Sequence, residues 1–229
     1  YFILSDGKSY KFFGTAQDHK RIGEGDTGPN TGGMGAYSPS NIITNKVEEK
    51  IKKEIIEPTL KGLKKLGCPF VGILYAGLII KNDQPKLIEY NIRLGDPECQ
   101  VLMMRLKTDL LKIILACKKK QINKITINWS NKKAITIVAS SKGYPNKQGK
   151  ISEIKNTEEI LLNNNQYLFH ASTFKKNNKI FTSGGRVLNA SALNKNLRSA
   201  RSTCVKMLKK INWKDKYFRR DIGWRAINN

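Results

Sequence analysis

The feature that most constrains the fold of this chain is an alternating run that ends in a Gly-Asp-Pro turn, residues 87–98. Side chains two residues apart on a β-strand project from the same face. Glu89, Asn91 and Arg93 therefore share one face of a predicted strand, while the apolar and aromatic residues between them point to the other. Mg²⁺ binds carboxylate and amide oxygens and often completes its shell with nucleotide phosphates. The pattern predicts either a metal–phosphate site or an edge strand with a solvated polar face.

A second segment, residues 17–39, combines charged residues with a dense set of glycines. Asp18, His19 and Lys20 stand at its start, and five glycines lie between residues 25 and 35. Glycine lets backbone amides approach a ligand closely, and successive amides can form an anion-binding nest. The segment is therefore expected to be a substrate-binding loop or a flexible surface loop. It is not a Walker A loop, because no Gly-Lys-Ser/Thr follows.

The remaining pattern predicts an α+β fold in which hairpins and helices alternate. The helix is expected to start with a capping box at Asn45 and Glu48, to be kinked by Pro58, and to stop at Gly67. Asn82 and Asp83 predict a hairpin turn. The expected elements are strands at 1–5 and 9–16, a helix at 45–66, paired strands at 70–80 and around Glu89, a helix at 98–118, strands at 133–141, 166–174 and 179–190, and a helix at 194–211.

Composition sets the domain organisation and limits the function. A lysine- and asparagine-rich connector at 118–131 predicts one domain at 1–117 and a smaller β-rich domain with one long helix at 132–229. No run of about 18 apolar residues predicts a membrane span. Four widely spaced cysteines without a CxxC pair favour neither a zinc nor a redox site, and a reducing cytoplasm is the expected location.

The chain carries 42 basic and 18 acidic residues, a formal charge of +24. Such a charge can indicate a nucleic-acid-binding module. Here the lysines are spread over the chain and accompany many Asn and Ile residues, which is typical of an AT-rich genome. A specific nucleic-acid partner is therefore not expected.

Five motifs together resemble those of phosphoribosylamine–glycine ligases, members of the ATP-grasp superfamily. They are QDHKRIGEGDTGPNTGGMGAYSP, VGILYAGLII, LIEYNIRLGDPECQ, TSGGRVL and RRDIGWRAI. The resemblance implies the C-terminal half of an ATP-grasp module followed by a small β-rich domain. It also implies a reaction of purine biosynthesis. ATP phosphorylates the glycine carboxylate, and the amine of 5-phosphoribosylamine displaces the phosphate to give glycinamide ribonucleotide.

The same resemblance assigns roles to the residues of the two segments. Glu89 and Asn91 are implied as ligands of Mg²⁺ or Mn²⁺, and Arg93 and Asp96 as catalytic residues at the phosphoryl or substrate end of the site. The implied substrate-binding residues are Asp18, His19, Lys20, Thr31, Gly32, Gly33, Met34 and Gly35.

The family chain is nearly twice as long as this one and begins with a domain and an ATP-binding half that are not found here. The chain is therefore expected to be a fragment or one half of a split enzyme, inactive by itself, whose partner is the missing N-terminal half. Two alternatives remain open: a catalytically inactive remnant that acts as an interaction partner, and a basic nucleic-acid-binding module.

Overall fold

The computed structural model describes residues 1–147 and 149–228, and the chain forms two compact units. Unit 1 contains Tyr1–Thr15, Pro39–Gly95 and Leu106–Ser130. Unit 2 contains Ala16–Ser38, Asp96–Arg105 and Asn131–Asn229. Both units are assembled from segments that are interleaved in the sequence. The mixed helix-and-sheet class matches the α+β prediction.

Unit 1 is built on a four-stranded antiparallel sheet with the order β2-β1-β7-β8. Its strands are β1 (Phe2–Asp6), β2 (Tyr10–Gly14), β7 (Val71–Lys81) and β8 (Gln84–Asn91). Asn82 and Asp83, with φ of +52° and +57°, join β7 to β8. Two positive φ values in a two-residue loop match the twist of a hairpin, so this predicted turn is confirmed.

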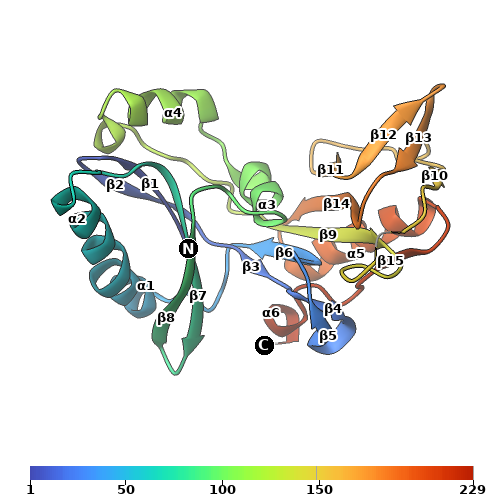
Figure 1. Ribbon diagram of the computed structural model, residues 1–229, viewed down its shortest axis with the longest axis horizontal. Coiled ribbons are helices and arrows are strands. Elements are labelled where there is room, and N and C mark those ends of the chain that lie inside the picture. The colour runs from blue at the N-terminus through green and yellow to red at the C-terminus, as the bar shows by residue number, and fades with distance from the viewer. Residues whose placement is uncertain (148, 229) are drawn as a thin grey trace. The chain divides into compact units, whose positions relative to one another are not determined.

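One face of this sheet is covered by the helical run α1 (Asn45–Lys50), η2 (Ile51–Ile56) and α2 (Glu57–Lys65) (Figure 1). The helix begins at Asn45 as predicted, but its cap is the preceding residue, Thr44, whose hydroxyl accepts the Val47 amide hydrogen at 3.3 Å. Pro58 lies in the first turn of α2, directly after the π-helical η2, in which the Glu57 amide donates to the Lys52 carbonyl oxygen. The helix ends before Gly67, as predicted, since Gly67 adopts a φ of +77°.

The predicted single helix at 98–118 is wrong. The structure has two helices, α3 (Glu98–Arg105) in unit 2 and α4 (Leu110–Lys118) in unit 1. Asp109 starts α4 by accepting the Lys112 amide hydrogen at 2.9 Å. An aspartate that caps a new helix competes with continuation of the preceding one. The short helix η3 (Ile122–Lys124) follows α4.

Unit 2 contains a sheet of order β11-β14-β9-β6-β3, in which β15 also pairs with β9. Helix α5 (Leu197–Lys210) packs on β9 and β14 (Figure 1). Its buried Ala200, Cys204 and Leu208 meet Ile135 and Leu188 of the sheet. The strands are β3 (Gln17–Asp18), β6 (Gly35–Ser38), β9 (Lys133–Ser141), β11 (Gln166–His170), β14 (Arg186–Asn194) and β15 (Lys216–Phe218).

Two smaller sheets complete unit 2. One has the order β10-β13-β12, with β10 (Glu153–Ile154), β13 (Lys179–Thr182) and β12 (Thr173–Lys176). The other pairs β4 (Arg21–Gly23) with β5 (Thr27–Asn30) around the turn η1 (Glu24–Asp26), and a short helix α6 (Trp224–Asn228) lies at the C-terminal end.

The strands predicted at 166–174 and 179–190 are each divided in two, the second at Ser183, Gly184 and Gly185. The segment expected to be a loop, residues 17–39, contains the strands β3, β4, β5 and β6. Within the described ranges, no helix is long and apolar enough to cross a membrane.

Candidate active site

Strand β8 places Glu89 and Asn91 side by side in unit 1. Their register partners on β7 are Gly77 and Tyr75, so both side chains leave the same face of the sheet. The Asn91 Nδ2 donates to the Glu89 Oε1 at 3.2 Å. Tyr90, between them, points to the helix-covered face, where its hydroxyl lies 2.6 Å from that of Thr59. The alternation predicted for this part of the strand is confirmed.

The last residues of the predicted alternation do not belong to the strand. Strand β8 ends at Asn91, Ile92 is 77% exposed, and Arg93 is also exposed. At Ile88 the register shifts, and this side chain is 67% exposed. Because the strand stops early, strand geometry does not place Arg93 on the face of Glu89 and Asn91.

The donor set on β8 fits part of a hard cation's shell. Glu89 offers a solvent-accessible carboxylate, and the Asn91 carboxamide oxygen is available beside it. Among residues 1–147 and 149–228, no group of three or more His, Cys, Asp or Glu side chains is arranged to hold a metal. Two protein oxygens match a Mg²⁺ ion that takes its other ligands from water and phosphate.

In unit 2, Asp18 forms the centre of a buried charged cluster. The Lys20 Nζ lies 2.7 Å from its Oδ2, and the His19 amide donates to its Oδ1 at 2.6 Å. The carboxylate is only 6% exposed. Burial and the neighbouring Glu98 raise the pKa of Asp18 to about 7, against the opposing effect of Lys20. Asp18 can therefore gain or lose a proton near neutral pH.

The turn that contains Thr31, Gly32, Gly33 and Met34 is held by hydrogen bonds from its own amides. The acceptors are the Lys20 carbonyl oxygen for Thr31 (2.7 Å), the Tyr144 hydroxyl for Gly32 (2.8 Å), the Thr31 hydroxyl for Gly33 (3.0 Å) and the His19 carbonyl oxygen for Met34 (2.8 Å). All four donors are thus used within the protein. The expected nest of free amides is absent at residues 31–34.

The atoms close to Gly33 leave no room for a side chain at this position. Its φ is +122°, and a Cβ at this position would lie 2.5 Å from the Pro97 Cδ and 2.8 Å from the Asp18 Oδ1. The glycine thus lets the turn at Pro97 and the Asp18 carboxylate approach the same backbone atom. Met34 and Gly35 are buried like Gly33, and Met34 belongs to the hydrophobic core of unit 2.

Arg186 joins the glycine segment to the Gly-Asp-Pro turn. Its Nη1 donates to the Gly32 carbonyl oxygen at 3.0 Å and to the Asp96 carbonyl oxygen at 2.7 Å. Its Nη2 lies 3.2 Å from the Asp96 Oδ2, and Gln100 donates to the Asp96 Oδ1 at 3.1 Å. Asp96 is therefore held by two side chains, those of Arg186 and Gln100.

His19 is buried, with 4% of its surface exposed, and contacts the C-terminal segment. Its Nε2 accepts the Gly223 amide hydrogen at 3.0 Å. Burial and the positive charge of Arg219 lower the pKa of His19 to about 4, so the ring is neutral at pH 7. The Nδ1 then carries the hydrogen, and it has no hydrogen-bond partner among the described residues.

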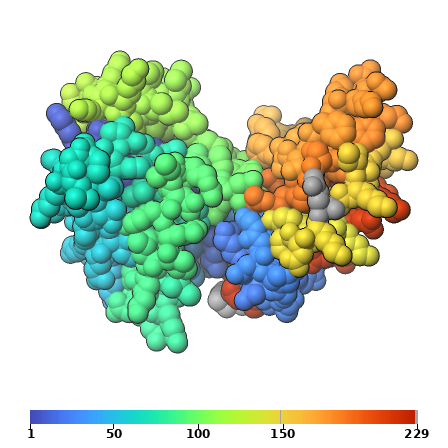
Figure 2. Space-filling view, in the orientation of Figure 1, coloured from blue at the N-terminus to red at the C-terminus, as the bar shows by residue number. Residues whose placement is uncertain are grey.

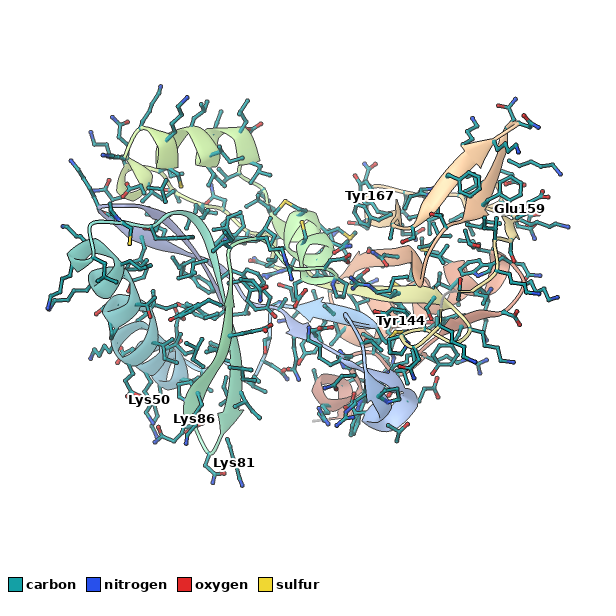
Figure 3. All side chains as sticks on the ribbon, in the orientation of Figure 1. Lys50, Lys81, Lys86, Tyr144, Glu159 and Tyr167 are labelled. Carbon is teal, nitrogen blue, oxygen red and sulfur yellow. The ribbon has the colours of Figure 1, made fainter. Side chains whose placement is uncertain are left out.

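Sequence reasoning gave no role to Arg186 or Tyr144. Arg186 follows two glycines in the motif TSGGRVL, and this position next to a glycine pair is the signal in the sequence that could have marked it. Tyr144 lies in a loop, and no pattern marked it. Figures 2 and 3 show its segment against the glycine-rich segment, in agreement with the bond from the Gly32 amide.

Family models match two parts of the chain. Residues 1–99 match the phosphoribosylglycinamide synthetase ATP-grasp (A) domain, and residues 134–225 match the C domain of the same protein. A phosphoribosylamine–glycine ligase from Agrobacterium fabrum is 49% identical over 227 residues, covering 99% of this chain and 53% of the relative. One from Vigna unguiculata is 45% identical over 217 residues, covering 93% and 70%.

Solved structures agree with these relatives. A phosphoribosylamine–glycine ligase from Thermotoga maritima superposes with a TM-score of 0.84 at 31% identity, over 96% of this chain and 54% of that one. A biotin carboxylase from Campylobacter jejuni, at 14% identity and a TM-score of 0.61, shares the fold over all of this chain and 48% of its own.

Together the fold and the matched domains define a protein of the ATP-grasp class. Within that class, the chain belongs to the phosphoribosylamine–glycine ligase family. It spans about half the length of most of the curated relatives it matches.

Proposed function

We propose that this chain is the C-terminal part of a phosphoribosylamine–glycine ligase. Acting with the portion that its relatives carry in addition, it would join glycine to 5-phosphoribosylamine with cleavage of ATP to ADP and phosphate. The observation that carries the proposal is 49% identity to such a ligase over 99% of the chain. Residues 1–229 by themselves are proposed to be inactive, since they span about half the length of such a ligase.

The proposed metal ligands are Glu89 and Asn91, which would hold Mg²⁺ or Mn²⁺ through one carboxylate and one amide oxygen. A bound divalent cation would neutralise charge on the phosphates of ATP. Arg93, exposed just after β8, is proposed to pair with phosphoryl oxygens. These roles are supported by the donor chemistry on one strand face and by the family of the chain.

The proposed substrate site is the cluster around Asp18. Lys20, half exposed, and Arg186, 22% exposed, offer positive charge to the carboxylate of glycine or the phosphate of the amine substrate. Asp18 is proposed to accept the proton that the amine loses when it attacks the acyl phosphate, because its pKa lies near 7. Thr31, Gly32 and Gly33 would form the adjoining wall, and Asp96 would fix the turn opposite them.

His19, Met34 and Gly35 contribute differently to this proposal. All three are buried, so they are proposed to support the substrate segment, residues 17–35, and not to contact the substrate directly.

The division at 118–131 into domains 1–117 and 132–229 is likewise proposed. It is supported by family-model matches that leave residues 100–133 between them. The four free cysteines favour a reducing cytoplasm.

The test is a chimaera in which residues 1–229 replace the matching half of the Agrobacterium fabrum ligase. We expect phosphate release that depends on glycine, 5-phosphoribosylamine, ATP and Mg²⁺ together. The matched control is the intact relative under the same conditions. A folded chimaera without this activity would favour the inactive remnant over the enzyme.

The basic alternative is addressed by a separate binding experiment. Lysines such as Lys50, Lys81 and Lys86 gather near the β7–β8 turn (Figure 3), and the Lys50 Nζ donates to the Asp83 carbonyl oxygen at 2.9 Å. Labelled RNA and DNA are expected to bind weakly and without sequence preference, and the binding should fall steeply with salt. Tight, sequence-selective binding at physiological salt would favour a nucleic-acid module.

A further inference from the structure

The C-terminal residues 217–226, here called the terminal strap, are tied to the charged hairpin, residues 21–30, which leads into the substrate segment. Residues separated by almost 200 positions thus meet within unit 2. The hydrogen bonds, donor first, include the Tyr217 hydroxyl to the Ile22 carbonyl oxygen (3.0 Å), the Arg220 amide to the Glu24 Oε1 (2.9 Å), the Gly25 amide to the Asp221 Oδ2 (2.8 Å) and the Trp224 Nε1 to the Asp26 Oδ2 (3.3 Å). The exposed Arg225 adds an ion pair, its Nη2 lying 2.8 Å from the Asp26 Oδ2.

Arg219 forms the centre of these contacts, and its side chain is completely buried. Its Nε and Nη2 donate to the two carboxylate oxygens of Asp221, both at 2.8 Å. Its Nη1 donates to the Asp26 Oδ1 at 2.9 Å and to the Arg21 carbonyl oxygen at 3.0 Å. Burying a guanidinium is costly unless its donors are satisfied. Here the donors of one side chain reach both the strap and the hairpin.

The two carboxylates respond to this cation. Burial by itself would raise the pKa of Asp26, but the hydrogen bonds and charge of Arg219 outweigh it and hold that pKa below its ordinary value. The same balance lowers the pKa of Asp221. Asp26 also adopts a φ of +59°, a conformation that non-glycine residues rarely take, so the turn needs such external support.

The strap also touches the substrate segment at both of its ends. At the first end, the Gly223 amide donates to the Nε2 of His19, the residue that follows Asp18. At the second end, Ile222 packs so closely on Gly35 that a Cβ there would lie 2.8 Å from the Ile222 Cγ1. The strap therefore supports the segment from behind and leaves Lys20 exposed.

We propose that Arg219 is a positioning residue. By locking the strap to the charged hairpin, it sets the positions of Asp18, Lys20 and the turn at Gly33 for the substrate. The inference rests on the proposed function, because the substrate is that of the ligase. A residue that served folding alone would change stability and leave the affinity of the folded enzyme for its substrates unaltered.

The experiment has two parts. In the active chimaera, Arg219→Met should raise the KM for glycine or 5-phosphoribosylamine at least tenfold while the KM for ATP changes less than twofold. In the chain alone, hydrogen exchange of peptides within residues 17–35 should quicken about tenfold, with no change in β9. Arg219→Lys keeps the positive charge but not the planar, forked arrangement of donors. Its KM values and exchange rates should therefore lie between those of wild type and Arg219→Met. Lys179→Met, which breaks an exposed ion pair with Glu153, is the matched control.

Three results would overturn the proposal. One is a folded Arg219→Met chimaera with unchanged substrate KM values. Another is an equal rise of all three KM values. The third is exchange that quickens equally in residues 17–35 and in β9, because that pattern reports global unfolding. If Arg219→Met does not fold, Arg219→Lys and the triple variant with Asp26→Asn and Asp221→Asn, which buries no unpaired charge, undergo the same measurements. An inactive wild-type chimaera would refute the proposed function, and the exchange experiment would still test the strap.

Discussion

The Glu89–Asn91 pair and the cluster around Asp18 are organised in opposite ways. The pair sits on one strand, two residues apart, with the carboxylate exposed. The cluster surrounds the buried Asp18 carboxylate and includes Gly32 and Arg186, which lie 154 residues apart in the sequence. A substitution at the Glu89–Asn91 pair can therefore abolish activity and leave stability unchanged. A substitution in the Asp18 cluster should affect activity and stability together.

The electrostatic environments of Asp18 and Glu89 also differ, because the first carboxylate is buried and the second is exposed. Asp18 is 6% exposed and lies near a second carboxylate, so its pKa is raised to about 7. Glu89 keeps contact with solvent. Burial makes the Asp18 charge costly, and the protein offsets part of that cost with Lys20 and with the His19 amide. The predictions below test whether the Glu89–Asn91 pair serves activity alone and whether the Asp18 cluster serves both activity and stability.

The largest effect is expected at Glu89. In the chimaera, Glu89→Gln should lower turnover by roughly 10³-fold, because a neutral amide cannot balance a divalent cation between phosphates. Since the side chain is exposed, the melting temperature should not move. Asn91→Asp, which keeps an oxygen ligand, should do less harm. Near-normal turnover of Glu89→Gln at ordinary Mg²⁺ would end the metal-site proposal.

Arg186→Met should affect both activity and stability. It leaves the Gly32 and Asp96 carbonyl oxygens without this donor and removes an ion pair. We expect a loss of about 2 kcal/mol in unfolding free energy and roughly a hundredfold loss of kcat/KM. Urea unfolding and steady-state kinetics measure the two effects, with Lys179→Met as the exposed-pair control. A change in only one of the two would show that the cluster is not the joint site described above.

Asp18→Asn should change how stability depends on pH. The folded-state pKa is about 7, above the ordinary value of 3.8, so the folded protein binds this proton more tightly than the unfolded chain. The Asp18 contribution is therefore fully present at low pH and is lost as pH rises from about 4 to 7. Relative to wild type, the variant should gain on the order of 2 kcal/mol between pH 5 and pH 8.

The wild-type protein, measured over the same pH range, is the control for Asp18→Asn. His19, whose pKa is lowered to about 4, works in the opposite sense, since its contribution is lost as pH falls through about 6.5 to 4. It is present in both proteins, so the difference between the two unfolding curves isolates Asp18. Parallel curves from pH 5 to pH 8 would contradict a raised Asp18 pKa.

The same contrast decides what could be predicted from the sequence. Strand alternation places Glu89 and Asn91 together with no knowledge of the rest of the fold, and positive-φ residues mark the turn at Asn82 and the helix end at Gly67. Arg186 meets Gly32 only through the pairing of several strands, which no local pattern encodes. The break before α4 was missed for a local reason: apolar periodicity continued through a capping aspartate, Asp109.

The glycine segment illustrates the same limit within one motif. Its glycines predicted close backbone approaches, and Gly33 makes one. Sequence reasoning assigned the free amides to a ligand, whereas those of residues 31–34 donate to Lys20, Tyr144, Thr31 and His19. A glycine pattern reports that something comes close, but the partner depends on the tertiary structure.

The last comparison is between two glycines, one from each unit. Gly33→Ala meets Pro97 and Asp18 within 3 Å at a φ of +122°, and should cost about 1–3 kcal/mol. Gly62 lies in α2 with nothing within 4 Å of an added Cβ, so Gly62→Ala should stabilise the chain by about 0.5–1 kcal/mol through helix propensity. Chemical unfolding of both variants against wild type measures the signs. Because only Gly33 touches the proposed substrate site, turnover in the chimaera should fall for Gly33→Ala and hold for Gly62→Ala. Equal shifts of the same sign would contradict the prediction, because the close approach at Gly33 would then make no difference to the effect of an added Cβ.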